Sequence, residues 1–127
     1  MGRRLDHIDL RARCLAEVTP FYEALLPALG FTRRDDVEGW LQFVSEEDPP
    51  GEFFGVTESP SHVPNENRVS FRAESMEKVG RLAELALKLG ARNMEGPMDY
   101  SPGYYAVFFE DPSGNRLEIC CREPRKP

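Results

Sequence analysis

An internal repeat constrains this chain more than any other feature of its sequence. The segment EDPPG at residues 47–51 recurs as EDPSG at residues 110–114, an offset of 63 positions (110 − 47). Each copy stands between two apolar runs, the first of which covers residues 40–44 in one copy and 104–109 in the other. Because Pro fixes φ and Gly can adopt positive φ, Asp-Pro-x-Gly between two such runs predicts a β-hairpin. The chain is therefore predicted to build one structural unit twice.

A segment with helical spacing precedes each predicted hairpin. Apolar residues recur at i, i+3, i+7 and i+10 in both halves, at Val18, Phe21, Leu25 and Ala28 and again at Val79, Leu82, Ala86 and Leu89. Thr19 and Ser75 are the expected N-caps, and Gly30 and Gly90 stand where a left-handed residue would end each helix. Pro27 is expected to kink or shorten the last turn of the first helix.

Alternating runs at residues 5–10 and 68–73 precede the helices and predict half-buried strands. Each half then reads strand, helix, strand, strand, strand. This order predicts an α+β fold of two tandem βαβββ modules, at about residues 4–57 and 67–122, in a single domain over residues 1–127. The first strand of each module is expected to be central.

Composition and charge narrow the classes of function that this chain can have. The chain has 16 Lys and Arg against 22 Asp and Glu, a net charge of −6, which argues against binding to nucleic acid. No apolar stretch approaches the length of a membrane span. The three cysteines, Cys14, Cys120 and Cys121, show no zinc or redox spacing, which favours a reducing compartment and a cytoplasmic location.

Strand parity indicates which side chains share a surface away from the helices. If Ile8 and its apolar neighbours face the first helix, His7 points to the other side. The same rule turns Arg68 and Glu118 outward in the second half. Aligning the two hairpins places Gly55 where Glu118 stands in the second half.

Aromatic residues on these faces predict a small-molecule pocket. Phe53 shares the face of Gly55. One alternating set of each aromatic run joins it, and parity leaves the choice open: Trp40, Gln42 and Val44 or Leu41 and Phe43, and Tyr104, Ala106 and Phe108 or Tyr105, Val107 and Phe109.

Three segments in order resemble a known family: LDHIDL at residues 5–10, FYEALLPALGF at 21–31 and GYYAVFFEDPSGNRLE at 103–118. They are similar to the vicinal oxygen chelate superfamily, which includes glyoxalase I, extradiol dioxygenases and bleomycin-resistance proteins. The resemblance covers nearly the whole chain. It implies paired βαβββ modules that form an incomplete barrel-like cleft. In enzyme members, one divalent metal in this cleft chelates two neighbouring substrate oxygens.

The family's metal-ligand positions correspond here to His7, Gly55, Arg68 and Glu118. His7 and Glu118 match ligand types for Fe, Mn, Ni or Zn and are expected to lie near a shared centre, with any divalent metal bound weakly. Gly55 cannot ligate. Arg68 is a fixed cation where a three-ligand member would have His. His62 could complete the ligand set only if the segment after the first module folds back.

The first function class is a glyoxalase-like protein that binds a small molecule in the cleft between its modules. In this interpretation the metal site of His7, Arg68 and Glu118 is degenerate. Arg68 offers a fork to an anionic ligand and is expected to form an ion pair with Glu118 or to be bridged to it by an acidic ligand. The further expected ligand-binding residues are Phe53, Trp40 and Tyr105.

The alternative class is a divalent-metal-dependent lyase or dioxygenase of the glyoxalase I or extradiol type. There His7 and Glu118 would be both metal ligands and catalytic residues. The sequence leaves open whether the protein is an enzyme. Exposed sheet edges and the habits of small family members predict a homodimer.

Overall fold

The structure is a computed structural model that describes residues 4–46 and 51–123. The chain divides into two compact units, Met1–Val63 and Pro64–Pro127. Each unit consists of a strand, a helix and three further strands, so the predicted α+β fold with two tandem βαβββ modules is confirmed. No helix in the described part of the chain is long and apolar enough to span a membrane.

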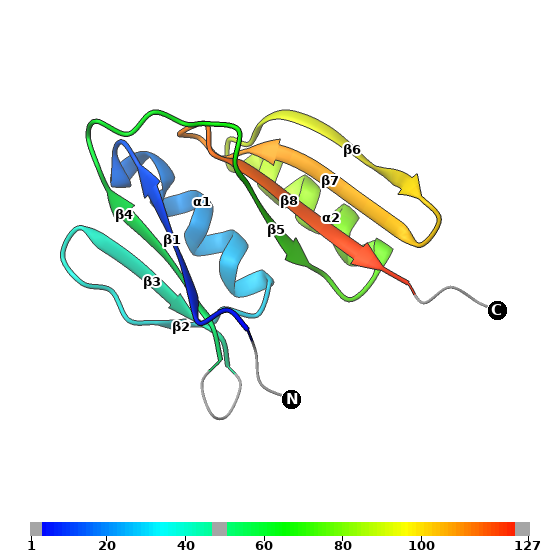
Figure 1. Ribbon diagram of the computed structural model, residues 1–127, viewed down its shortest axis with the longest axis horizontal. Helices are drawn as coiled ribbons and strands as arrows, with labels where there is room; N and C mark the ends of the chain where they lie inside the picture. Colours follow the sequence, from blue (N-terminus) through cyan, green and yellow to red (C-terminus); the bar gives the residue numbers. More distant parts are fainter. Residues whose placement is uncertain (1–3, 47–50, 124–127) are drawn as a thin grey trace. The chain divides into compact units, whose positions relative to one another are not determined.

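The first unit contains β1 (His7–Ala12), α1 (Leu15–Ala28), β2 (Arg33–Arg34), β3 (Trp40–Val44) and β4 (Phe53–Glu58). Its sheet has the order β1-β4-β3-β2, with β1 parallel to β4 and the other pairs antiparallel (Figure 1). α1 packs on β3 and β4. The largest fully buried side chains of this unit are Phe21 and Tyr22 from the helix and Phe43 and Phe54 from the sheet.

The second unit contains β5 (Arg68–Arg72), α2 (Met76–Lys88), β6 (Arg92–Ser101), β7 (Tyr104–Glu110) and β8 (Arg116–Arg122). Its sheet repeats the topology of the first unit in the order β5-β8-β7-β6. In Figure 1, α2 lies behind this sheet. The apolar sheet residues Val107, Leu117 and Ile119 are fully buried, and α2 contacts β7 and β8, the strands that carry them.

β1 and β5 are edge strands of their own four-stranded sheets. Their central place in the paired modules stays a prediction. Each pairs within its sheet with one neighbour only, β1 with β4 and β5 with β8. Sequential strands joined by hairpins take the remaining places. The helix that follows the first strand returns the chain to the far side of the sheet.

The second helix begins and ends as predicted, whereas the first begins earlier. Ser75 accepts a hydrogen bond from the Lys78 amide at 3.1 Å, and Gly90 has a φ of +100°. Thr19, the expected first N-cap, lies inside α1, which starts four residues before it. The amide of Leu15 donates to the carboxylate of Glu58 at 2.9 Å. A side chain from β4, distant in sequence, thus caps the N-terminus of α1, and the local sequence does not indicate this cap.

The predicted hairpin between β7 and β8 is confirmed. Asp111 is fully buried, and its Oδ1 accepts hydrogen bonds from the amides of Ser113 at 2.8 Å and Asn115 at 3.0 Å. Gly114 has a φ of +95°, which explains the glycine in this copy. The corresponding turn of the first copy falls at residues 47–50, outside the described residues.

Candidate functional site

Strand register settles which residues of the first unit share the face away from α1. His7 pairs with Phe53, and Phe53 with Val44. Gly55 pairs with Gln42, two residues after Trp40 on β3. Directly paired residues project to the same side of a sheet. Of the two alternatives for β3, the set with Trp40 therefore lies on the face of His7.

His7, Phe53 and Trp40 form an aromatic cluster on this face. The imidazole of His7 stacks on the Phe53 ring, with centroids 4.4 Å apart and planes 4° from parallel. The Trp40 ring lies 6.4 Å from that of Phe53. The Nδ1 atom of His7 lies 2.8 Å from the carboxylate of Asp6. The sequence prediction that His7 and Phe53 share one surface is confirmed, and the register adds Trp40, which parity had left open.

The indole of Trp40 occupies the space beside Gly55. A Cβ atom at residue 55 would overlap the indole nitrogen of Trp40. This nitrogen is buried and has no hydrogen-bond acceptor among the described residues. Gly55 corresponds to Glu118 of the second unit. The first unit therefore has no metal ligand at this position and fills the space with an aromatic ring.

In the second unit, Glu118 is the buried carboxylate of the face away from α2. Its residue is 7% exposed. The Tyr104 hydroxyl donates to its Oε2 atom. Partial burial and the hydrogen bond to Glu118 raise the pKa of Tyr104 to about 12. Tyr104 therefore stays protonated near neutral pH and remains a donor to the carboxylate.

Arg68 lies on the same face but does not pair with Glu118. Its guanidinium carbon stands 4.6 Å from the centroid of the Phe108 ring, and Phe108 is the register partner of Glu118. Among the described residues, the Arg68 side chain forms neither a hydrogen bond nor an ion pair. The direct ion pair predicted from the sequence is therefore not formed, because Tyr104 holds the carboxylate and the aromatic ring holds the guanidinium.

Tyr105 points away from these groups, and Tyr104 takes the place expected for it. Tyr105 pairs with Cys121, whereas Phe108 pairs with Glu118. Since parity reverses with each residue along a strand, Tyr105 lies on the α2 side of the sheet. Of the two alternatives left open for β7, the set with Tyr104, Ala106 and Phe108 shares the face of Glu118.

The residues present do not fit the metal that the fold family implies. The described residues include no group of three His, Cys, Asp or Glu side chains placed to hold a metal ion. Arg68 offers no lone pair, and Glu118 already accepts from Tyr104. The backbone amide of His62 donates to Ser59 in the segment after β4. His7 and Glu118 belong to different units, so their shared centre stays a prediction.

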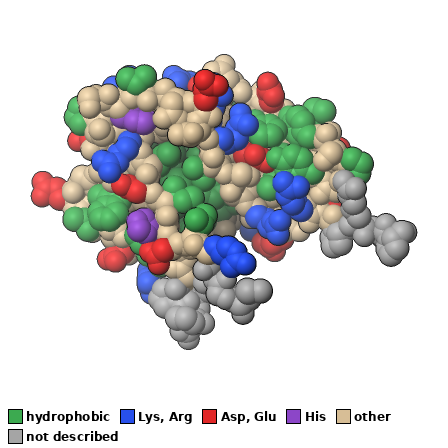
Figure 2. Space-filling model, viewed as in Figure 1, with side chains coloured by type: hydrophobic (Ala, Val, Ile, Leu, Met, Phe, Trp, Pro, Cys, Tyr) green, Lys and Arg blue, Asp and Glu red, His purple; other side chains and the backbone are tan. Residues whose placement is uncertain are grey.

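Basic and aromatic groups surround Glu118 beyond those selected from the sequence. Arg122 stands over the Tyr104 ring, 4.3 Å from its centroid, and Tyr100 meets Phe108 edge to face at 5.0 Å. Figure 2 shows Lys and Arg side chains gathered on the second unit near the ends of β5 and β8. Alternation along β8 places Arg122 on the same face as Glu118, so the sequence could have identified it as a site residue. No local signal marks Tyr100, because the register of β6 is irregular.

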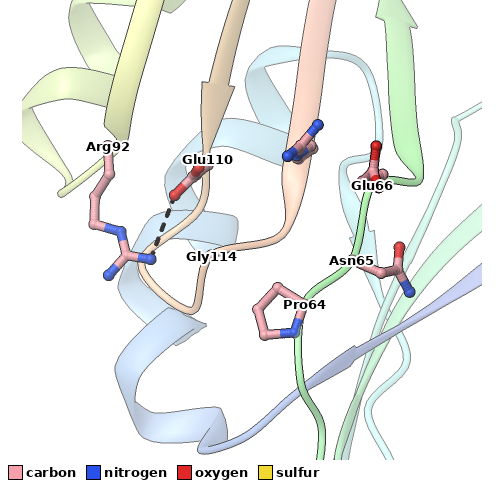
Figure 3. Close-up of a pocket in the computed structure, with 7 residues that line it drawn as sticks. Pro64, Asn65, Glu66, Arg92, Glu110 and Gly114 are labelled. Carbon is pink, nitrogen blue, oxygen red and sulfur yellow. Dashed lines mark hydrogen bonds and ion pairs between the residues drawn. The ribbon is translucent and has the colours of Figure 1, made fainter.

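Two pockets open on the second unit. One has a volume of about 460 Å³ and is lined by the 64–66 segment, the turn at Gly114 and the side chains of Arg92, Glu110 and Arg116. Figure 3 shows Arg92 reaching Glu110 across this pocket, opposite Pro64, Asn65 and Glu66. The other pocket, of about 250 Å³, is lined by Arg68, Phe108, Glu110 and Arg116 among others.

Comparison with solved structures supports the same fold. A glyoxalase/bleomycin resistance protein from Albidiferax ferrireducens superposes with a TM-score of 0.82 at 21% identity, covering 95% of this chain and 100% of that one. A putative glyoxalase from Bacillus halodurans gives 0.75 at 23% identity, with 93% and 95% covered. The fosfomycin resistance protein FosX from Listeria monocytogenes gives 0.72 at 20% identity, with 97% and 96% covered.

The family assignment rests on the sequence itself. No curated protein matches the chain. The sequence profile of the Glyoxalase/Bleomycin resistance protein/Dioxygenase superfamily matches residues 4–119. This match covers most of the chain and agrees with the paired βαβββ units and with the resemblance seen in three segments. The chain therefore belongs to the Glyoxalase/Bleomycin resistance protein/Dioxygenase superfamily.

Proposed function

We propose that this chain is a metal-independent member of its family that binds a small anionic molecule through Arg68. The observation that carries the proposal is the position of the Arg68 guanidinium over the Phe108 ring, with no carboxylate partner among the described residues. A guanidinium stacked on a ring keeps its N–H fork free at its edge. That fork matches the geometry of a carboxylate or phenolate.

Neighbouring groups would orient such a molecule. Glu118 lies opposite Phe108 in the sheet and is held by the Tyr104 hydroxyl. Its carboxylate can accept a hydrogen bond from a hydroxyl or N–H group of the ligand. The rings of Phe108 and Tyr100 offer apolar surface beside these polar groups. Apolar walls with a few convergent polar groups are typical of small-molecule sites.

The alternative, a divalent-metal-dependent lyase or dioxygenase, is less well supported by the residues. It needs a third ligand near Glu118, and position 68 supplies a positive charge that repels a dication. We retain the expected homodimer as part of the proposal, since β1 and β5 both leave a sheet edge unpaired within their own sheets. Light scattering at tens of micromolar would show a monomer if this is wrong.

Binding of benzoate to chelator-treated protein tests the proposal. Benzoate carries one carboxylate on one ring, which are the two features that Arg68 and Phe108 recognise. Calorimetric titration should show that Arg68→Gln weakens benzoate binding about tenfold, the loss expected for one charge-assisted fork. Arg81→Gln is the matched control, because in the described part of the chain Arg81 pairs only with Glu77, on the exposed side of α2. Binding that needs added Mn²⁺, or that is equal in the Arg68 variant, would contradict the proposal.

A further inference from the structure

Four charged side chains form one transverse row across the second sheet. Arg92 pairs with Glu110, Glu110 with Arg116, and Arg116 with Arg68 in the register of neighbouring strands. The row therefore crosses β6, β7, β8 and β5 in turn. Because directly paired residues project to the same side, all four belong to the face that carries Glu118. We call these four residues the arginine row.

The arginine row has an excess of positive charge. It places three guanidinium groups against one carboxylate, in a chain whose net charge is −6. Glu110 is engaged by Arg92, whose Nη2 atom lies 3.4 Å from its Oε1. Neither the Arg116 nor the Arg68 side chain has an ion pair or hydrogen bond in the described part of the chain. Like charges directly opposite on neighbouring strands repel each other.

Both pockets of the second unit open on the arginine row. The larger contains Arg92, Glu110 and Arg116, and the smaller contains Arg68 together with the same Glu110 and Arg116. Arg116 is only partly exposed and lines both pockets. A partly buried guanidinium without a counter-ion is costly, and an anion in either pocket would relieve this cost.

We infer that the arginine row binds a small molecule with two neighbouring anionic groups. Arg68 and Arg116 are register partners on adjacent strands. Both line the smaller pocket, where the Arg68 guanidinium lies over Phe108, so both forks can reach one ligand there. Each fork fits one carboxylate or one pair of phosphate oxygens. Glu66 lines the larger pocket and Glu95 the smaller. These carboxylates offset part of the positive charge of the arginine row and can accept hydrogen bonds from hydroxyl groups of the same ligand. This inference rests on the proposed function, because Arg68 is common to both.

Benzoate and phthalate separate the two ideas, since phthalate adds one carboxylate on the neighbouring ring carbon. We expect phthalate to bind chelator-treated protein at least about tenfold more tightly than benzoate at low ionic strength. Arg116→Gln should reduce phthalate binding to the level of benzoate, a larger loss than the same variant causes for benzoate. Phenyl phosphate is the third probe. Tighter binding than phthalate would show that the preferred ligand carries a phosphate group, and weaker binding would show that it carries two carboxylates.

Three variants guard the result. Glu110→Gln removes the only carboxylate of the arginine row and should tighten phthalate binding, a change that no structural role of Glu110 would produce. Arg116→Lys keeps the charge without the fork and should give intermediate affinity even if Arg116→Gln proves unstable. Arg81→Gln should change nothing. The inference would be overturned if phthalate binds no more tightly than benzoate. It would also be overturned if phthalate binds Arg116→Gln as tightly as it binds Arg116→Lys. Benzoate binding that is equally tight in Arg68→Gln and in the parent protein would instead overturn the proposed function.

Discussion

The Tyr104 hydroxyl donates a hydrogen bond to the Glu118 carboxylate, across the antiparallel pair of β7 and β8. A carboxylate that is 7% exposed needs such a partner, because a buried charge without one is strongly destabilising. In this protein, a neighbouring strand supplies the partner. The pair therefore links the stability of the second sheet to the chemistry of its open face.

Replacing Tyr104 by Phe should destabilise the protein by about 1–3 kcal/mol, the cost of leaving a buried acceptor unsatisfied. Urea unfolding at neutral pH measures this loss. Tyr100→Phe is the matched control, because the Tyr100 hydroxyl forms no hydrogen bond among the described residues. Equal losses in the two variants would show that the hydrogen bond does not stabilise the fold.

The raised pKa of Tyr104, about 12 in the folded protein against 10.0 ordinarily, predicts a late-titrating tyrosine. The folded state holds this proton more tightly than the unfolded state does. The resulting stability is present below pH 10 and is lost as the pH rises from 10 towards 12. Ultraviolet absorbance of phenolate should show one tyrosine ionising near pH 12, and Tyr104→Phe should remove that component. A titration curve unchanged by the substitution would contradict the assignment.

Arg68→His should strengthen the binding of manganese or nickel, because it replaces a fixed cation with an imidazole on the face of Glu118. We expect an affinity at least about tenfold above that of the parent protein, corresponding to one added ligand of about 1.4 kcal/mol. Calorimetric titration of chelator-treated protein measures this. Arg68→Gln removes the charge without adding a ligand and separates the two contributions. If His and Gln give the same metal affinity, position 68 does not approach the metal.

Gly55→Ala should destabilise the first unit by about 1–3 kcal/mol, because the new methyl group would overlap the Trp40 indole. Trp40→Phe shortens the ring system and should reduce the cost of the alanine. A double-mutant cycle by urea unfolding measures the coupling between the two positions. Gly80→Ala is the control, since a Cβ atom there meets nothing within 4 Å. Additive effects of Gly55→Ala and Trp40→Phe would show that the two side chains do not meet.

Much of the fold could be predicted from the sequence because the same local signals occur twice. The cap at Ser75 and the glycine after each helix depend on neighbours within a few residues, and these predictions were confirmed. Thr19 failed as a cap because the carboxylate that serves the first helix comes from Glu58, 43 positions after Leu15. Interactions across such distances leave no trace in a local pattern.

The sequence predicted which residues share the face of the candidate site, but not which side chains they contact. Parity placed Arg68 and Glu118 on one face correctly, since it depends only on alternation within a strand. It could not distinguish Tyr104 from Tyr105, because both faces of β7 are aromatic or apolar and the register was unknown. The sequence also could not predict that Arg92, Glu110 and Arg116 lie side by side, because this depends on the register of three strands.

The contact between Trp40 and Gly55 makes the residues that each position can accept interdependent. A carboxylate introduced at residue 55 alone would meet the indole, and a smaller residue at position 40 alone would leave a void over glycine. Either single substitution is expected to destabilise the first unit. Placing a carboxylate ligand in β4 therefore requires coordinated changes at residues 40 and 55.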